Sequence, residues 1–304
     1  MENGFVDWRE TPAELDRARA EQPSVFAGAD GRMVGIFTPP QRVDDRERGC
    51  LVFFTRPRCH RNRMWVETAR RMAARGWAGF RFDYHGCGDS EGSSAGLDPN
   101  RPYRADAVAA LRHLRHEHGQ QRFVLIGSCF DARTALSAFP EEGGAVRGIV
   151  FMAAPVMELE TMGKARADQK GWRHLLRALR NPTNWTSLGR RERWRHMANV
   201  LLRVTRRSAG GAAASDLGLE SGFVADFAAM TRSGARALFL YGNGDQEYAS
   251  FQVAEQRLFP RLTAGERARL AVEVWPGALH GFLELNRQRA TIARIESWLE
   301  ELDA

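Results

Sequence analysis

Short apolar runs alternate with longer amphipathic stretches along most of the chain. The runs are hydrophobic on both faces, as in strands of a parallel sheet that helices cover on both sides. They are Cys50–Thr55, Ala78–Phe82, Phe123–Ile126, Gly148–Met152, Ala237–Tyr241 and Ala271–Trp275. The stretches with helical periodicity between them are Asn62–Arg75, Arg104–Glu117, Asp131–Phe139, Ala249–Leu258 and Phe282–Leu302. This alternation predicts an α/β fold with a mostly parallel sheet flanked by helices.

Two regions depart from the alternation. Near the N-terminus we expect a short helix over Thr11–Ala20, followed by a hairpin over Val25–Phe37 that turns at Asp30-Gly31. Residues 155–233 contain no convincing strand and space their apolar residues as helices do. We therefore predict a core formed by residues 1–154 and 234–304, with residues 155–233 inserted as a helical cap.

Composition is that of a globular protein: 43% of the 304 residues are hydrophobic and 27% are charged. The net charge of +7 invites a nucleic-acid interpretation, but 42 of the 44 basic residues are arginine, a bias typical of a GC-rich genome. No reading helix or base-stacking motif appears, so nucleic acid is not an expected partner. The positive charge is concentrated in residues 161–210, which hold 13 basic and two acidic residues.

The sequence also bears on compartment and cofactors. No run of eighteen apolar residues occurs, and Met1–Ala20 has charges but no apolar core, so we expect a cytoplasmic protein without membrane contact. Four irregularly spaced cysteines without a C-x-x-C pair argue against a disulfide framework. Two predicted loops carry possible metal ligands, but their spacing fits no zinc pattern, so we expect no metal and no cofactor. These ligands are Cys59, His60, His85 and Cys87.

The residues that follow the predicted strands carry the candidate chemistry, because ligands of parallel sheets bind beyond the strands' carboxyl ends. After Phe123–Ile126 comes the sequence G-S-C-F-D and then a helix, which is the arrangement of a nucleophile elbow. Cys129 takes the apex in this register; a register with Ser128 at the apex would need a glycine where Ile126 stands. The backbone N–H of Phe130 is then available to an oxyanion.

Two more candidates follow later strands. Asp245 ends the turn G-N-G-D after Ala237–Tyr241, and His280 lies in a loop after Ala271–Trp275. A carboxylate in such a turn could orient the imidazole as a general base. The chain order of nucleophile, acid and base is that of α/β-hydrolases.

Over roughly residues 30–304 the chain resembles α/β-hydrolases of the serine aminopeptidase-like or dienelactone hydrolase-like group. The matching motifs are F-D-Y-H-G-C-G-D-S-E-G, L-I-G-S-C-F-D, Y-G-N-G-D and H-G-F. The resemblance implies a catalytic triad of Cys129, His280 and Asp245. It also implies an oxyanion hole formed by the N–H of Phe130 and that of Arg56 or its neighbour Thr55.

Three residues depart from the family pattern. Cysteine stands in place of the usual serine, Asp131 in place of the second elbow glycine, and His85 in place of an arginine. The charge of Asp131 should oppose formation of a thiolate at Cys129.

The cysteine suggests what the reaction is. A thiol attacks activated carbonyls to form a thioester, whereas its attack on a plain amide is uphill. We therefore predict a hydrolase or acyltransferase acting on a thioester, lactone or activated ester, as a thioesterase or cyclase does, for example in natural-product biosynthesis. The basic cap would suit an acyl group borne on an acyl carrier protein or coenzyme A. The alternative is a scaffold with a non-hydrolytic role, as a cyclase, a lyase or a partner protein in a biosynthetic complex.

Overall fold

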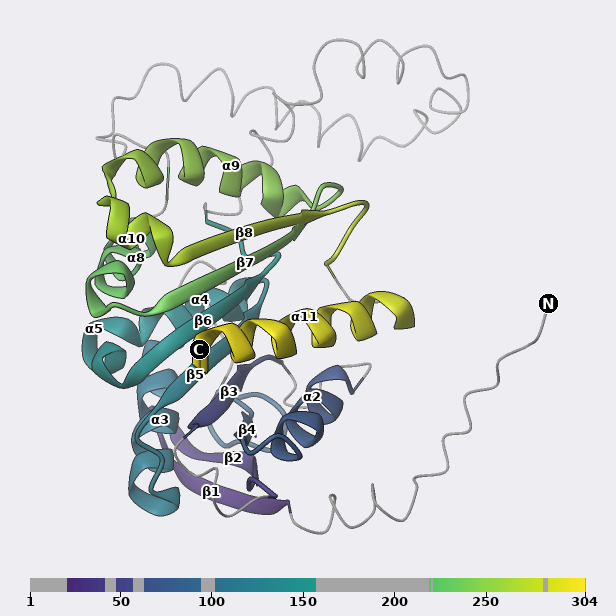
Figure 1. Ribbon diagram of the computed structural model, residues 1–304. Coiled ribbons are helices and arrows are strands. Elements are labelled where there is room, and N and C mark those ends of the chain that lie inside the picture. Colours follow the sequence, from purple (N-terminus) through teal and green to yellow (C-terminus); the bar gives the residue numbers. More distant parts are fainter. Residues whose placement is uncertain are drawn as a thin grey trace, which may run out of the picture.

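The computed structural model describes residues 21–41, 48–56, 63–93, 102–156, 219, 221–280 and 284–303. Over these residues the chain forms an eight-stranded sheet with the order β1-β2-β4-β3-β5-β6-β7-β8 (Figure 1). The strands are β1 (Gln22–Gly28), β2 (Gly31–Thr38), β3 (Cys50–Phe54), β4 (Ala78–Phe82), β5 (Phe123–Ser128), β6 (Val146–Met152), β7 (Arg236–Gly242) and β8 (Leu270–Trp275). Each of the six predicted apolar runs coincides with one of these strands to within two residues at either end, so these strand predictions are confirmed.

Most of the sheet is parallel. Every neighbouring pair from β4 through β8 runs in the same direction, and β1 and β2 extend the sheet as an antiparallel hairpin. In the hairpin Gly28 pairs with Gly31, so the turn is Ala29-Asp30, one residue before its predicted place. The predicted α/β class, with a mostly parallel sheet between helices, is confirmed.

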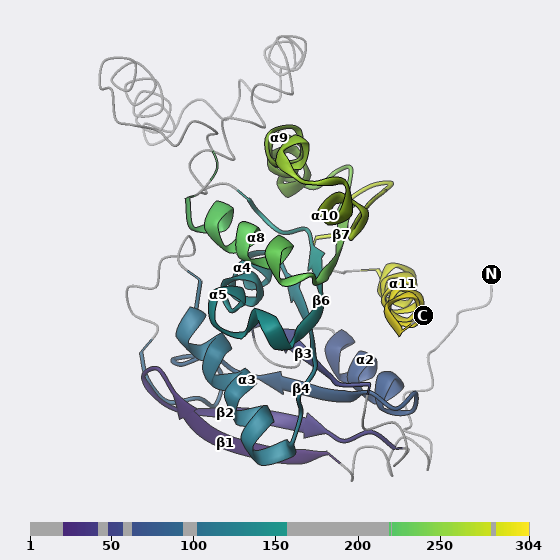
Figure 2. The ribbon, with the colours of Figure 1, turned by 60° about the vertical axis from the view of Figure 1, so that its left-hand side comes forward.

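Two helical layers enclose the sheet (Figure 2). Side chains of each central strand alternate between the two faces: Val52 and Phe54 pack in one core cluster, Leu51 and Phe53 in the other. The first face is covered by α3 (Arg104–His118), α4 (Phe130–Ser137), α5 (Phe139–Glu142), α8 (Ser221–Ser233) and α9 (Gln246–Leu258). The second is covered by α2 (Met64–Ala73) and α11 (Leu285–Asp303). The short helix α10 (Ala264–Ala268) and two 3-10 turns, Gly143–Ala145 and Phe259–Arg261, complete the described elements.

The helix α8 lies within the segment 155–233 that was predicted as a cap. Its residues Phe223, Phe227 and Met230 follow one helical face and are buried in the first core cluster, where α8 contacts α4 and α5. Ser221–Ser233 therefore packs on the first face of the sheet, and the predicted division into core and cap stays a prediction. Of the rest of the predicted cap, residues 157–218 and 220 lie outside the described residues, as does the predicted helix Thr11–Ala20.

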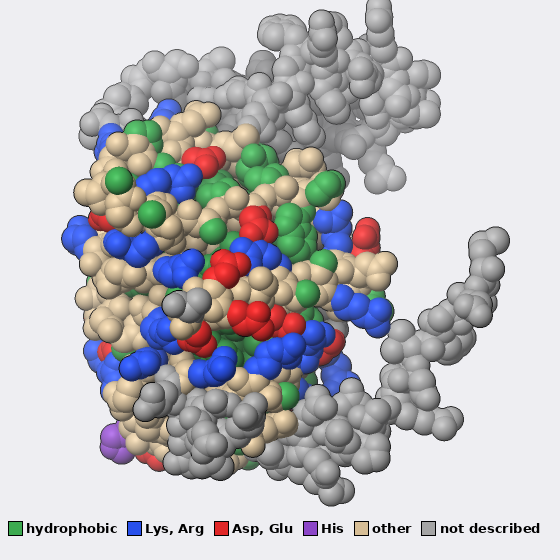
Figure 3. All heavy atoms as spheres, in the orientation of Figure 1, with side chains coloured by type: hydrophobic (Ala, Val, Ile, Leu, Met, Phe, Trp, Pro, Cys, Tyr) green, Lys and Arg blue, Asp and Glu red, His purple; other side chains and the backbone are tan. Residues whose placement is uncertain are grey.

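The face that carries α2 and α11 shows basic and acidic side chains interleaved (Figure 3). Arginines there pair with carboxylates from other elements: Arg294 with Glu273 at 2.6 Å, Arg71 with Glu296 at 2.7 Å, and Arg147 with Asp303 at 2.8 Å. Such partly exposed pairs contribute about 0–1 kcal/mol each. Their effect is to balance charge locally on this face. None of the described helices has both the length and the apolar character that a membrane span requires.

Candidate active site

The turn between β5 and α4 is sharp and strained. Cys129 stands at its apex with φ 53° and ψ −134°, a conformation that residues with a side chain rarely adopt. A Cβ atom on Gly127 would lie 2.5 Å from the Cα of Ala132, so the close packing of strand and helix requires glycine there. This is the geometry of a nucleophile elbow, and its apex residue is Cys129 rather than Ser128.

Three chemically active side chains converge at this apex. The sulfur of Cys129, a ring nitrogen of His280 and a carboxylate oxygen of Glu247 all lie within 4.8 Å of one another. Cys129 is half-buried, Glu247 is buried and His280 is exposed. The structure thus brings together the predicted nucleophile and the predicted base, which are 151 positions apart in the chain. In active sites without a bound substrate, the nucleophile and the base often lie slightly farther apart than a hydrogen bond requires.

Glu247 was not predicted as a site residue. It lies in the first turn of α9, two residues after Asp245, where an acidic residue is ordinarily explained by the helix dipole. The sequence signal that could have identified it is its position directly after the acid turn. A helix start just beyond a strand's carboxyl end directs its first residues toward the site.

The side-chain carboxylate of Asp245 binds backbone N–H groups of the loop that carries His280. Its carboxylate accepts hydrogen bonds from the N–H of Gly242 at 2.8 Å, of Leu279 at 3.0 Å and of His280 at 3.0 Å. Among the described residues these contacts are all to main-chain groups, and none is to the imidazole ring. Asp245 therefore fixes the loop that presents His280, and its predicted contact with the ring stays a prediction.

The predicted oxyanion donors come from two segments, because Phe130 begins α4 whereas Thr55 and Arg56 follow β3. The register pairs Phe54 with Gly127, so Thr55 and Arg56 continue from β3 alongside the β5–α4 turn. The Arg56 side chain reaches Asp131, with Nε 2.8 Å from a carboxylate oxygen. This ion pair ties the loop after β3 to the first turn of α4. It gives Asp131, the departure from the elbow pattern, a structural partner.

The thiol of Cys129 is poorly disposed to ionise. Burial raises its pKa to about 12, and the negative charges of Glu247 and Asp131 act in the same direction. The N–H of Phe130 and the guanidinium of Arg56 act in the opposite direction but do not compensate. The predicted opposition of Asp131 to the thiolate is therefore present, and burial is the larger cause. Burial and the two carboxylates therefore favour the protonated thiol over the thiolate at the apex.

Asp131 provides a stability prediction. Burial raises the pKa of its carboxyl to about 6 in spite of the nearby Arg56. Because this pKa lies above the unfolded value, the associated stability is fully present below about pH 4 and is lost as the pH rises through 6. Between pH 4 and pH 7.5 the unfolding free energy of Asp131→Asn should rise by about 2 kcal/mol relative to that of the native protein. Urea unfolding at both pH values measures this difference; a pH-independent difference would contradict it.

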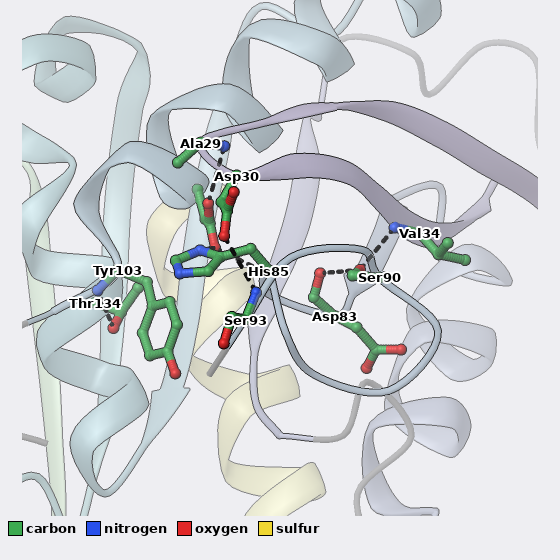
Figure 4. Close-up of polar contacts among 10 residues, drawn as sticks. Ala29, Asp30, Val34, Asp83, His85, Ser90, Ser93, Tyr103 and Thr134 are labelled. Carbon is green, nitrogen blue, oxygen red and sulfur yellow. Dashed lines mark hydrogen bonds and ion pairs between the residues drawn. The ribbon is translucent and has the colours of Figure 1, made fainter. Parts of the chain in front are cut away.

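The glycine-rich loop after β4 is held by a polar network (Figure 4). The Ser90 hydroxyl donates to the carbonyl of Asp83 at 2.7 Å and accepts from the N–H of Val34 at 2.9 Å. His85 Nδ1 lies 2.7 Å from a carboxylate oxygen of the fully buried Asp106, which also accepts the His85 N–H at 2.9 Å. The histidine that replaces the family's arginine therefore anchors this loop to α3. Of the metal ligands considered, Cys59 and His60 lie outside the described residues.

The sheet order, the two helical layers and the elbow define an α/β-hydrolase-type protein. The family model described as serine aminopeptidase, S33, matches residues 45–203, and the chain belongs to this family. A search of curated proteins with this sequence finds no significant match.

Solved structures with the same fold are similar at low identity. A proline iminopeptidase from Mycobacterium smegmatis aligns with a TM-score of 0.57 and 14% identity, over 93% of this chain and 99% of its own. An esterase from Pyrococcus furiosus aligns with a TM-score of 0.55 and 12% identity, over 97% and 94%. A thermophilic esterase from Thermogutta terrifontis gives 0.51 and 14%, over 93% and 100%. These likenesses establish the shared fold.

Proposed function

We propose that the protein is a hydrolase or acyltransferase in which Cys129 attacks a thioester, a lactone or an activated ester. One observation supports this more than any other. A cysteine occupies the strained apex between β5 and α4, and a ring nitrogen of His280 lies within 4.8 Å of its sulfur. Both the strain and the convergence of chain-distant groups are features of sites at which covalent catalysis takes place.

In the proposed reaction His280 takes the thiol proton as the sulfur attacks the substrate carbonyl. A bond forms between Sγ and the carbonyl carbon, and the negative charge passes to the carbonyl oxygen, facing the N–H of Phe130 and that of Arg56 or Thr55. The oxyanion then collapses, the bond to the leaving group breaks, and the leaving group takes the proton from His280. The resulting thioester is transferred to water or to another nucleophile, which His280 deprotonates.

The raised pKa of the Cys129 thiol bears on the choice of substrate. A thiol that is deprotonated only during attack needs a reactive carbonyl and a leaving group that departs readily. Thioesters, lactones and activated esters satisfy this requirement, whereas plain amides do not. We therefore propose acyl transfer rather than peptide hydrolysis, although the family is described by a peptidase activity.

Trapping of the acyl-enzyme tests this proposal. We expect a β-lactone probe to add its full mass to the protein, and peptide mapping to locate the adduct on Cys129. The variant His280→Ala should lose the adduct because nothing then removes the thiol proton, whereas His116→Ala, at an exposed histidine on α3, should keep it. An adduct on Ser128, or equal labelling of Cys87 and Cys129, would contradict the proposal.

A second candidate function is a scaffold of the same fold with a non-hydrolytic role. The observation that favours it is the raised pKa of Cys129, since a thiol that resists ionisation is also suited to an inert site. The trapping experiment separates the two functions, because a scaffold would form no acyl adduct while remaining folded.

We further propose that the acyl group arrives on an acyl carrier protein or on coenzyme A. The support is the excess of basic residues in 161–210, a segment that lies outside the described residues. Acidic carriers and phosphates are attracted to positively charged residues, and the attraction weakens as salt rises. We expect kcat/KM for a carrier-bound thioester to fall between 50 and about 300 mM salt, while that for a small free thioester stays constant. An equal response of both substrates would contradict carrier docking.

A further inference from the structure

The arrangement of Cys129, Glu247 and His280 differs from that of a linear proton relay. In a relay the carboxylate and the nucleophile bind opposite nitrogens of the imidazole, which separates them by about 7 Å. Here the Glu247 oxygen lies within 4.8 Å of the sulfur as well as of the imidazole. The three groups therefore surround a common point rather than form a line.

The donor set at this point is that of a soft or borderline divalent metal. Thiolate, imidazole and carboxylate are the protein ligands of zinc, at about 2.3 Å, 2.0–2.1 Å and 2.0–2.2 Å from the ion. In a tetrahedral site these lengths place the donor atoms about 3.3–3.6 Å apart. The three donor atoms lie within 4.8 Å of one another, so each distance must shorten by little more than 1 Å at most. A small change of side-chain rotamer is enough for such a shift.

Glu247 adds an independent reason to expect a cation. Its side chain is 3% exposed, and within the described part of the chain no basic residue forms an ion pair with it. Its carboxylate accepts a long hydrogen bond of 3.5 Å from Gln246 Nε2 in that part. A buried carboxylate without an ion pair is stabilised when a cation binds beside it.

We propose that Cys129, Glu247 and His280 bind one Zn²⁺ ion, with a fourth position open to water or a substrate atom. Zinc replaces the proton of the Cys129 thiol, which passes to the buffer, and no oxidation or reduction takes place. When Zn²⁺ is bound, neither Cys129 nor His280 is available for catalysis. The binding itself is independent of the proposed function, whereas the inhibition that follows from it rests on that function.

Metal titration of the full-length, untagged, metal-free protein tests the site. We expect one Zn²⁺ per chain in competition with a chromophoric chelator. Co²⁺ in its place should give a sulfur-to-metal charge-transfer band, which Cys129→Ser abolishes. Glu247→Gln should weaken Zn²⁺ binding at least about tenfold, because the loss even of an indirect partner of a metal ligand costs 10–100-fold. Mg²⁺, which prefers oxygen ligands, should not compete.

Two matched variants control the titration. Glu255→Gln removes a carboxylate elsewhere on α9, and Cys87→Ser removes a half-exposed thiol on the glycine-rich loop. Both should bind Zn²⁺ as the native protein does, and thermal unfolding should show that every variant is folded. Equal affinity in Glu247→Gln and the native protein, or a charge-transfer band that survives Cys129→Ser, would overturn the site. Acyl trapping in metal-free protein tests the proposed function separately, so either proposal can fail alone.

Discussion

The variant Cys129→Ala should lose essentially all turnover of a small acyl thioester. Removal of a nucleophile that acts together with a base typically lowers kcat by about 10⁴–10⁶-fold. The fold should persist, because one small half-buried group is deleted and the expected stability loss is about 1 kcal/mol. Steady-state kinetics with a chromogenic thioester and thermal unfolding of the same preparation measure both quantities.

Two further variants sharpen this expectation. Ser128→Ala alters the neighbouring hydroxyl and should leave turnover close to the native rate, because Ser128 ends β5 and does not occupy the apex. Cys129→Ser should retain part of the activity on activated esters, since the base that deprotonates a neutral thiol also serves a hydroxyl. If Cys129→Ala stayed active and Ser128→Ala did not, the nucleophile would be Ser128.

The sheet could be predicted because its strands are apolar on both faces. Runs such as Leu51–Phe54 and Leu238–Tyr241 leave no solvent face, and only a sheet between two helical layers buries both sides. The order of elements then placed Cys129 and His280 at the same edge of the sheet. The elbow was predictable for a local reason, because Gly127 is the residue that the packing against Ala132 demands.

Other features depend on contacts between segments that the sequence does not connect. Asp131 can be read as an unfavourable charge, but its pairing with Arg56 requires β3 to lie beside β5. Glu247 resembles any acidic residue of a first helical turn until α9 is placed over the elbow. The helix α8 has an ordinary amphipathic pattern, and only the packing shows that its apolar face lies in the first core cluster.

Alkylation of Cys129 in the metal-free protein should be unusually slow at neutral pH. Iodoacetamide reacts with the thiolate, and a pKa of about 12 in place of 9.0 lowers the thiolate fraction about a thousandfold. The rate should rise about tenfold per pH unit through pH 10, because the pH is then still well below the pKa of the folded thiol. Peptide-resolved mass spectrometry at several pH values measures this rate, with the half-exposed Cys87 as a reference in the same sample.

The causes of the raised pKa can be separated by variants. Burial is the largest, so unfolding in guanidinium should restore an ordinary thiol rate at Cys129. Glu247→Gln and Asp131→Asn each remove a negative charge near the sulfur and should accelerate alkylation of the folded protein, with the greater increase at Glu247. Rapid alkylation that does not change between pH 6 and pH 9 would instead reveal a preformed thiolate–imidazolium pair. Such a pair would attack without prior transfer of a proton to His280, and plain amides would then become conceivable substrates.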